Sequence, residues 1–369
     1  MIKVAVIFGT RPEAIKMTPV IKELMGNPDS FHTTVWVTAQ HRELLDQVLA
    51  LFEIKPDYDL GIMKAGQDEF DVTSSVLSKL KSAFLKEKPD LVLVHGDTTT
   101  AMAASIAAFY MKTRIGHVEA GLRTHDKYHP FPEEMNRKIV GALADLHFAP
   151  TPAAKRNLLL EGVMESDIHV TGNTAVDALF LALDKLGIST GKTPYPRVEK
   201  KVLVTTHRRE SFGVGLENIC LALKELARLN PSIEFVFPAH PNPNVRKPVK
   251  SILGDIENIK LIEPLDYLPF VKLMSESYMI LTDSGGVQEE APSLGKPVLL
   301  MREVTERPEA VEAGTVAVVG TDKSAIIEMA MRLLTDKELY RNMSMSHNPY
   351  GDGKAAQRIV TIIKELSIN

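Results

Sequence analysis

One short run, residues 117–137, concentrates carboxylates and histidines in the sequence HVEAGLRTHDKYHPFPEEMNR. Glu119 follows an apolar segment, and Glu133 follows the proline-bracketed HPFP. Carboxylates repel one another and lose hydration when they are buried, so clustering them costs free energy. A solvated acidic face would explain them simply, but the run follows a strand-like segment, where α/β proteins place chemistry. We therefore interpret the two glutamates as candidate acid–base groups.

A third carboxylate, Asp97, lies in HGDTTT (residues 95–100) at another expected strand end. On local evidence Asp97 or Thr98 could equally be only a helix N-cap. The carboxyl ends of parallel strands lie along one edge of a sheet, however, and ligands bind beyond that edge. We therefore expect Asp97, Glu119 and Glu133 to converge on one site.

Metal binding is a competing use for these carboxylates, because His117 and His129 lie close by in the sequence. No HExxH or comparable ligand spacing occurs, so we interpret both histidines as packing or hydrogen-bonding residues. The glycine fingerprint of dinucleotide-binding folds is also missing from the first turn, FGTRPE (residues 8–13). The sequence therefore predicts no metal and no other cofactor.

Cationic residues stand at two further expected strand ends. In FGTRPE, Arg11 precedes Pro12, a residue suited to the first position of a helix, so Arg11 and the helix N-terminus could bind phosphate. An ordinary turn with a solvated arginine remains the alternative. In TTHRRES (residues 205–211), His207 stands beside Arg208 and Arg209, a pattern that suits an anionic leaving group.

The segment LTDSGGVQEEAPSLGKPVLLMREVTERPEA, residues 281–310, combines several nucleotide-binding features. Ser284, Gly285 and Gly286 would let backbone approach a phosphate at a helix N-terminus. Glu290, one turn later, could accept hydrogen bonds from ribose hydroxyls. TERPEA then repeats the Arg-Pro-Glu of TRPEA near the start of the chain.

Composition narrows the class of protein. The chain has 369 residues, of which 44% are hydrophobic and 24% charged, and its net charge is −4. These values suit a globular protein of two domains and give no reason to expect nucleic acid or membrane partners. Cys220 is the single cysteine, which excludes an intrachain disulfide and fits a reducing cytosol. The start reads directly as a strand and turn rather than a signal peptide, and no apolar run approaches a membrane span. We expect a cytoplasmic protein.

The elements that must position these residues alternate between short apolar runs and helical patterns. Continuous apolar runs of this length suit parallel sheets covered on both faces. We predict two doubly wound, Rossmann-like domains that face a cleft, joined through a Gly/Pro-rich linker at 187–200. The predicted strands are 3–8, 33–38, 90–96, 114–120, 145–150 and 168–172 in the first half, and 201–207, 233–240, 259–264, 278–285, 297–302 and 315–320 in the second.

These motifs together resemble the non-hydrolysing UDP-N-acetylglucosamine 2-epimerases. The resemblance runs through essentially the whole chain, by way of FGTRPEAIKM, TAQHRELLDQVL, HGDTTT, GHVEAGLRT, PFPEEMNR, TGNTAVDAL, THRRES, LTDSGGVQEEAPSLGKPVL, TERPEA and NPYGDGKA. It implies a GT-B-type α/β fold and a homodimer. The domains would be residues 1–173 together with a C-terminal helix, 354–369, that crosses back to them, and residues 174–353, which bind nucleotide.

The resemblance also implies roles for individual residues. The catalytic set would be Asp97, Glu119, Glu133 and His207. The substrate-binding set would be Arg11, Lys16, Phe270, Ser284, Gly285, Gly286, Glu290 and Arg307, with Phe270 near the uracil. A second UDP-GlcNAc would bind as an allosteric effector at Gln40, Glu43, Arg208 and His240.

The implied reaction interconverts UDP-GlcNAc and UDP-ManNAc by elimination of UDP to 2-acetamidoglucal and re-addition, and it would supply ManNAc for cell-surface polysaccharide. Carboxylates suit this chemistry because loss of UDP builds oxocarbenium character on the sugar. Three alternatives remain open: a hydrolysing epimerase that releases ManNAc and UDP, a GT-B glycosyltransferase, and a nucleotide-sugar binding protein.

Overall fold

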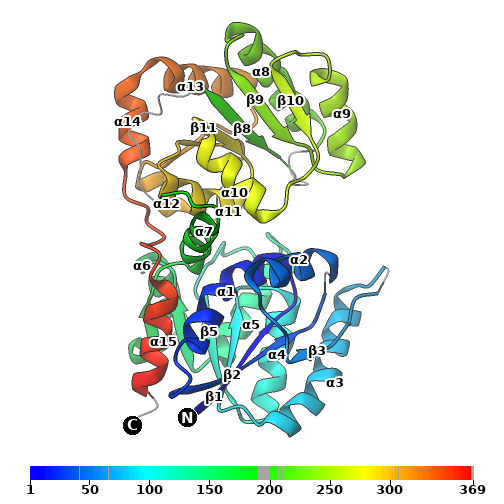
Figure 1. Cartoon of the computed structure of the whole chain (residues 1–369), viewed down its shortest axis with the longest axis vertical. Coiled ribbons are helices and arrows are strands. Elements are labelled where there is room, and N and C mark those ends of the chain that lie inside the picture. The colour runs from blue at the N-terminus through cyan, green and yellow to red at the C-terminus, as the bar shows by residue number, and fades with distance from the viewer. Residues whose placement is uncertain are drawn as a thin grey trace. The chain divides into compact units, whose positions relative to one another are not determined.

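A computed structural model describes residues 1–40, 42–64, 66–189, 200–206, 208, 212–303, 305 and 307–366. The chain forms two compact units (Figure 1). Unit 1 comprises Met1–Ala178 and Tyr350–Asn369, and unit 2 is the continuous segment Leu179–Pro349. Each unit is an α/β domain built on its own parallel sheet.

The sheet of unit 1 has the strand order β3-β2-β1-β4-β5-β6-β7, with all described pairings parallel. Strand order reverses between β1 and β4, which is the doubly wound pattern predicted from the sequence. The strands are β1 (Ile2–Phe8), β2 (Phe31–Val37), β3 (Tyr58–Asp59), β4 (Leu91–His95), β5 (Arg114–Val118), β6 (Leu146–Ala149) and β7 (Ile168–Val170). The helices are α1 (Arg11–Met25), α2 (Arg42–Phe52), α3 (Glu69–Glu87), α4 (Thr99–Tyr110), α5 (Glu133–Leu143), α6 (Pro152–Leu160), α7 (Thr174–Lys185), which runs on into unit 2, and α15 (Ala355–Leu366).

Unit 2 has the same doubly wound topology, and the strand order in its sheet is β10-β9-β8-β11-β12-β13. Its strands are β8 (Lys201–Thr205), β9 (Glu234–Pro238), β10 (Ile259–Ile262), β11 (Met279–Thr282), β12 (Val298–Leu300) and β13 (Val316–Val318). Its helices are α8 (Val214–Leu229), α9 (Pro243–Leu253), α10 (Tyr267–Glu276), α11 (Gly285–Glu290), α12 (Pro308–Glu312), α13 (Lys323–Thr335) and α14 (Lys337–Met345). The prediction of two doubly wound domains is confirmed.

Apolar side chains from both faces of each sheet build the cores. In unit 1, Ala5 and Ile7 of β1 pack with Trp36 of β2 and Val92 of β4. In unit 2, Val202 and Val204 of β8 pack with Phe235 of β9. Burial on both faces explains why the central strands read as continuous apolar runs rather than alternating ones.

The C-terminal helix α15 belongs to unit 1, as predicted, and packs against α1 (Figure 1). Its buried face includes Ile359, Val360 and Ile363. Asp177 of α7 accepts hydrogen bonds from the backbone N–H groups of Ala355 and Ala356, at 3.2 and 2.8 Å, and so caps the first turn of this helix. A capped amphipathic helix therefore closes the face of α1.

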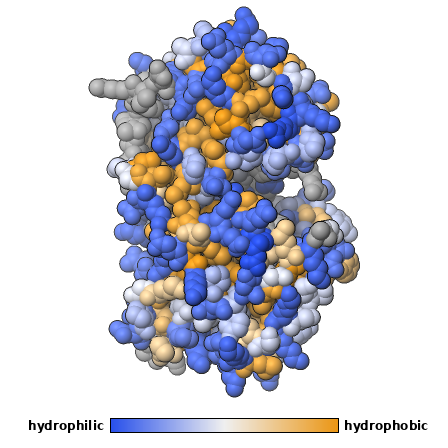
Figure 2. Space-filling model, turned by 45° about the vertical axis from the view of Figure 1, so that its right-hand side comes forward, coloured by the Kyte–Doolittle hydropathy of each residue, from blue (hydrophilic) through white to orange (hydrophobic). Residues whose placement is uncertain are grey.

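The surface seen in Figure 2 mixes hydrophilic and apolar side chains, and hydrophilic residues make up most of its outline. Among the described residues, no helix has the length and apolar character that crossing a bilayer requires.

Candidate active site

Glu119 lies just beyond β5, whose last residue is Val118, so the chain leaves the strand two residues earlier than predicted. Its backbone φ is 62°, a left-handed value that is uncommon for a residue other than glycine and often marks functional sites. The side chain is 9% exposed. This backbone turn directs a carboxylate into a buried position at the end of the sheet.

Three groups from three elements face one oxygen of this carboxylate. Lys16 Nζ of α1 lies 2.5 Å from Glu119 Oε2, and Asn173 Nδ2 donates to the same oxygen at 2.9 Å. His95 Nε2, at the end of β4, lies 3.6 Å away. Burial by itself would raise the pKa of Glu119, but Lys16 and His95 together hold it well below its usual range. Glu119 is therefore an anion at neutral pH.

Asp97 lies in the loop between β4 and α4, and its side chain remains 28% exposed. Arg137 of α5 donates a charge-assisted hydrogen bond to Asp97 Oδ2, and Asn136 Nδ2 donates to its backbone oxygen at 3.0 Å. The first turns of α5 thus hold the loop that carries Asp97.

Glu133 is the first residue of α5, and its Oε2 is buried without a hydrogen-bond partner among the described residues. Burial raises the pKa of Glu133, and the negative charge of Asp97 raises it further. The structure therefore brings Asp97 and Glu133 within electrostatic reach of each other, and the pKa values of the two glutamates, Glu119 and Glu133, shift in opposite directions.

A buried hydrogen-bond network around Glu134 and Arg137, which we call the brace, was not predicted from the sequence. The carboxylate of Glu134 is fully buried and accepts the backbone N–H groups of Thr124 at 3.0 Å and His125 at 3.1 Å. It also pairs with Arg137 at 3.2 Å, so one guanidinium joins Glu134 to Asp97. The signal that could have indicated this brace is the i, i+3 spacing of Glu134 and Arg137 on one helix.

The first turn, FGTRPE, is organised by its glutamate. Glu13 is fully buried and accepts hydrogen bonds from Gly9 N at 3.1 Å, Thr10 N at 2.9 Å and Thr10 Oγ1 at 2.8 Å. It also accepts Thr98 Oγ1, from the loop of Asp97, at 2.7 Å. Glu13 thus ties two strand-end loops together. Arg11 is half-buried at the first position of α1.

His117 and His129, which we interpreted as packing or hydrogen-bonding residues, have different surroundings. His117 is fully buried in β5, and its Nε2 lies 2.7 Å from the Gly96 oxygen. Burial lowers the pKa of His117 to about 3, so the ring is neutral. His129 is exposed and contacts Asp126 at 3.0 Å. Among the described residues, no group of three or more His, Cys, Asp or Glu side chains could hold a metal.

In unit 2, the predicted phosphate-binding segment Ser284–Gly286 lies at the start of α11, with Ser284 as the N-cap residue and the two glycines in the first turn. A Cβ on Gly285 would lie 2.6 Å from the Arg307 guanidinium, so a side chain there would displace that guanidinium, whereas a Cβ on Gly286 would meet nothing within 4 Å. Arg307 itself donates to Glu289 Oε1 at 2.7 Å. The guanidinium is thus held against this segment by a buried carboxylate.

The predicted ribose and uracil residues lie on neighbouring helices. Glu290, at the end of α11, is 8% exposed and accepts a hydrogen bond from Tyr267 Oη at 2.9 Å. Phe270 is half-buried in α10, one turn beyond Tyr267. Tyr267 is therefore a further candidate that the sequence analysis did not single out.

The four predicted effector residues come from both units. Gln40 accepts a hydrogen bond from Thr100 Oγ1 at 3.0 Å, and Glu43 is exposed in the first turn of α2. In unit 2, the backbone N–H of Arg208 donates to Asp283 at 2.9 Å, and His240 is exposed at the end of β9. The predicted catalytic residue His207 lies outside the described residues.

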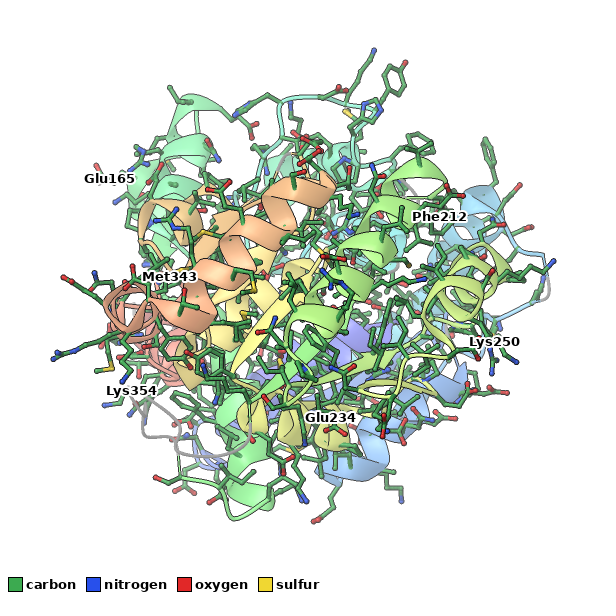
Figure 3. The ribbon with its side chains drawn as sticks, turned by 90° about the horizontal axis from the view of Figure 1, so that it is seen from above. Glu165, Phe212, Glu234, Lys250, Met343 and Lys354 are labelled. Carbon is green, nitrogen blue, oxygen red and sulfur yellow. The ribbon has the colours of Figure 1, made fainter. Side chains whose placement is uncertain are left out.

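One pocket of unit 2, of about 480 Å³, lies beside α9 and β10. Val249 and Leu261 contribute apolar surface to it, and Arg246, Lys250 and Lys260 contribute positive charge. Lys250 lies at the outer edge of the view in Figure 3. The residues that line this pocket include none of the predicted site residues, so we do not assign the substrate to it.

The sequence and fold of the chain match those of a known protein family. The family described as UDP-N-acetylglucosamine 2-epimerase matches residues 22–364. A probable UDP-N-acetylglucosamine 2-epimerase of Ralstonia nicotianae is 57% identical over 372 residues, which cover 99% of each chain. The crystal structure of a UDP-GlcNAc 2-epimerase from Neisseria meningitidis bound to UDP-GlcNAc is 52% identical, with a TM-score of 0.91, and covers 98% of this chain and 100% of that one.

A more distant structure extends the likeness to the fold alone. The glycotransferase of kitacinnamycin is 12% identical, has a TM-score of 0.66, and covers 99% of this chain and 98% of that one. The two-domain fold is thus the GT-B type that the sequence predicted. The similarity to epimerases, in contrast, is strong in sequence as well as structure and spans the full length. The chain therefore belongs to the UDP-N-acetylglucosamine 2-epimerase family.

Proposed function

We propose that this enzyme inverts carbon 2 of UDP-GlcNAc to give UDP-ManNAc, reversibly and without releasing the sugar. The observation that carries this proposal is the difference between two glutamates at strand and helix ends of unit 1. Lys16 and His95 hold the pKa of Glu119 well below its usual range, whereas burial and the charge of Asp97 raise the pKa of Glu133. The elimination needs a fixed anion to stabilise the positive charge on the sugar, and re-addition needs a group that can hold and deliver a proton.

The chemistry explains why such a set is needed. The proton on carbon 2 is not next to a carbonyl, so it becomes removable only as the bond from carbon 1 to the UDP oxygen breaks. The electron pair of the C2–H bond then forms the C1=C2 double bond of 2-acetamidoglucal, and UDP leaves with the C1–O pair. Re-addition reverses both changes, with the proton delivered to the opposite face. Carboxylates stabilise the positive charge that develops on the sugar.

We assign roles from the environment of each group. Glu119 stays anionic and stabilises the developing oxocarbenium charge. Asp97, ion-paired with Arg137, accepts the proton from carbon 2, and Glu133 supplies the proton on the other face. In the reverse reaction Asp97 and Glu133 exchange these roles.

We assign binding of the nucleotide to the predicted substrate-binding residues, together with His207. The diphosphate would be bound and neutralised by Ser284–Gly286, Arg11, Lys16, Arg307 and His207. Glu290 would hold the ribose, and Phe270 would lie near the uracil. The close approach of Gly285 and Arg307 supports this assignment, because it puts a guanidinium beside the first residue of α11.

The test starts from the purified enzyme and UDP-GlcNAc alone, with products followed by ¹H and ³¹P NMR. We expect a stable mixture of two UDP-sugars. Stoichiometric UDP with free ManNAc would instead identify a hydrolysing epimerase, and conversion only after an acceptor is added would identify a glycosyltransferase. In heavy water the product should carry deuterium at carbon 2; retention of the original hydrogen would contradict elimination.

We further propose that the enzyme is a cytoplasmic homodimer that supplies ManNAc for cell-surface polysaccharide. UDP-sugars and a single buried cysteine both suit the cytosol. Large exposed apolar side chains at the end of α4, Phe109 and Tyr110, support self-association. Light scattering of the purified enzyme gives the mass directly, and a monomer at micromolar concentration would contradict the dimer.

A further inference from the structure

Asn173 forms hydrogen bonds through both atoms of its side-chain amide and through both backbone groups, and its backbone oxygen accepts the N–H of Val176 at 3.1 Å. Its side-chain Nδ2 donates to Glu119 Oε2 at 2.9 Å, and its Oδ1 accepts the backbone N–H of Ala175 at 2.9 Å. Its backbone N–H donates to the oxygen of Tyr350 at 2.7 Å. The residue is 3% exposed. A buried amide whose nitrogen and oxygen are both engaged is held in one orientation.

Asn173 also lies beside the two segments through which the chain leaves and re-enters unit 1. The chain leaves unit 1 at Ala178, shortly after Asn173, and re-enters it at Tyr350. The two backbone segments pass so closely that a Cβ on Gly172 would lie 3.3 Å from the Tyr350 oxygen. Asn173 therefore joins Glu119 to both segments that connect unit 1 to the rest of the chain.

The amide also decides which oxygen of Glu119 can act. Lys16, His95 and Asn173 all face Oε2, whereas Oε1 lies on the side of Gly96, the residue before Asp97, where an added Cβ would be 3.8 Å from it. Without the amide, the carboxylate could rotate between Lys16 and His95, and its charge would lose one donor. Oε1 is thus held toward the loop of Asp97.

We propose that Asn173 is a positioning residue of the reaction: its amide fixes Oε2 of Glu119, presents Oε1 to the sugar, and anchors that arrangement to the crossing segments. The inference rests on the proposed function, since it assigns Glu119 to the reacting sugar. It predicts that loss of the amide changes turnover and its pH dependence, while nucleotide binding in unit 2 is unaffected.

The decisive variant is Asn173→Asp, which keeps the oxygen that caps Ala175 and the backbone bond to Tyr350 but replaces the donor to Glu119 with an oxygen. Asn173→Ala removes the donor without adding charge. We expect kcat to fall about 10- to 100-fold in both, which corresponds to one charge-assisted hydrogen bond. KM for UDP-GlcNAc should stay within about twofold.

The pH profile separates positioning from a merely structural role. The charged and titratable groups that face Glu119 are Lys16 and His95, so these three groups together contribute an acidic limb to kcat, in addition to the one set by the base Asp97. Removing the amide takes away a donor that stabilises the Glu119 carboxylate, so the pKa of Glu119 should rise. This acidic limb of kcat should then move to higher pH by about one unit, and further in Asn173→Asp than in Asn173→Ala.

The matched control is Asn258→Asp, which removes a part-buried amide from unit 2 that donates to the backbone oxygens of Ala227, Asn230 and Ile233. It should lower the melting temperature without moving the acidic limb. If the wild-type enzyme makes no UDP-ManNAc, the proposed function fails. If it does, and the limb of folded Asn173 variants stays in place, the positioning role is overturned. It is also overturned if both variants unfold, because Asn173 would then act only in the fold.

Discussion

Asp97, Glu119 and Glu133 differ in what surrounds them although all three are carboxylates. Glu119 receives donors from Lys16 and Asn173, Asp97 pairs with Arg137, and Glu133 has a buried oxygen without a described partner. Neighbours of this kind set protonation states more strongly than residue type does. Each group therefore carries a separable part of the proposed reaction.

Neutral isosteres test this division. We expect Asp97→Asn, Glu119→Gln and Glu133→Gln each to lose about 10²- to 10⁴-fold in kcat, the usual contribution of a general acid or base. The exposed Glu165, replaced by Gln, is the matched control and should remain fully active. Circular dichroism checks that the variants fold. Wild-type turnover in any of the three would remove that residue from the mechanism.

The protonation of Glu133 gives a pH prediction with a definite sign. Burial raises the pKa of Glu133, Asp97 raises it further, and Glu69 makes a smaller contribution in the same direction. A proton donor loses its function as pH rises through its pKa, so Glu133 should set an alkaline limb of kcat. Glu69→Gln removes one negative charge and should move that limb to lower pH by roughly a few tenths of a unit.

The comparison is the pH profile of the two proteins at constant ionic strength. Adding salt should shrink the difference between them, because the effect of Glu69 is electrostatic. A limb that moves upward in Glu69→Gln would contradict the assignment of Glu133 as the donor.

At this scale the sequence singled out the carboxylates as candidates but not their partners. Asp97, Glu119 and Glu133 drew attention because each follows a strand-like run or a proline-bracketed loop. The contacts of Glu119 with Lys16 and Asn173 join residues 103 and 54 positions apart, and no local spacing indicates them. The pairing of Arg137 with Asp97, 40 positions apart, was missed for the same reason.

At the scale of elements, the cap of α15 carries a pH dependence. Asp177 accepts the N–H groups of Ala355 and Ala356, yet burial raises its pKa to about 6, and the nearby charge of Asp352 adds to this. The folded state thus binds the proton more tightly than the unfolded chain does. Its contribution to stability is complete below the unfolded value, near 4, and is lost as pH rises through about 6.

We therefore expect unit 1 to lose on the order of 2–3 kcal/mol of unfolding free energy between pH 4 and pH 8 from this group. Asp177→Asn should remove that dependence. Trp36, the single tryptophan, is buried in unit 1, so its fluorescence during urea unfolding follows this unit alone. Asp184→Asn, exposed on the same helix, is the control and should keep the wild-type slope. An unchanged slope in Asp177→Asn would show that the cap is not the source.

Most elements were predictable because burial on both faces of a parallel sheet leaves long apolar runs. The short strand β3, Tyr58–Asp59, was missed because two residues give no period to detect. The predicted strand at 114–120 extends beyond the observed end at Val118. The left-handed backbone of Glu119 ends the strand there, and such a conformation is set by tertiary contacts rather than by local propensity.

At the scale of the whole molecule, the predicted effector residues belong to both units, with Gln40 and Glu43 in unit 1 and Arg208 and His240 in unit 2. A ligand that binds one conformation of the enzyme better shifts the population toward it. We expect the reaction that starts from pure UDP-ManNAc to show a lag, abolished by a trace of UDP-GlcNAc. Immediate hyperbolic kinetics would contradict the effector site. His240→Ala should lengthen the lag while leaving the forward KM within about twofold.

The return of α15 to unit 1 separates the order of synthesis from the order of folding. A ribosome makes Met1–Ala178 and then all of unit 2 before it reaches the helix that packs on α1. At about 5–20 residues per second, the first unit waits roughly ten to forty seconds for its last helix. During that interval the nascent chain would expose the apolar face of α1 that α15 later covers. Unit 2, encoded by one continuous segment, can complete its fold first.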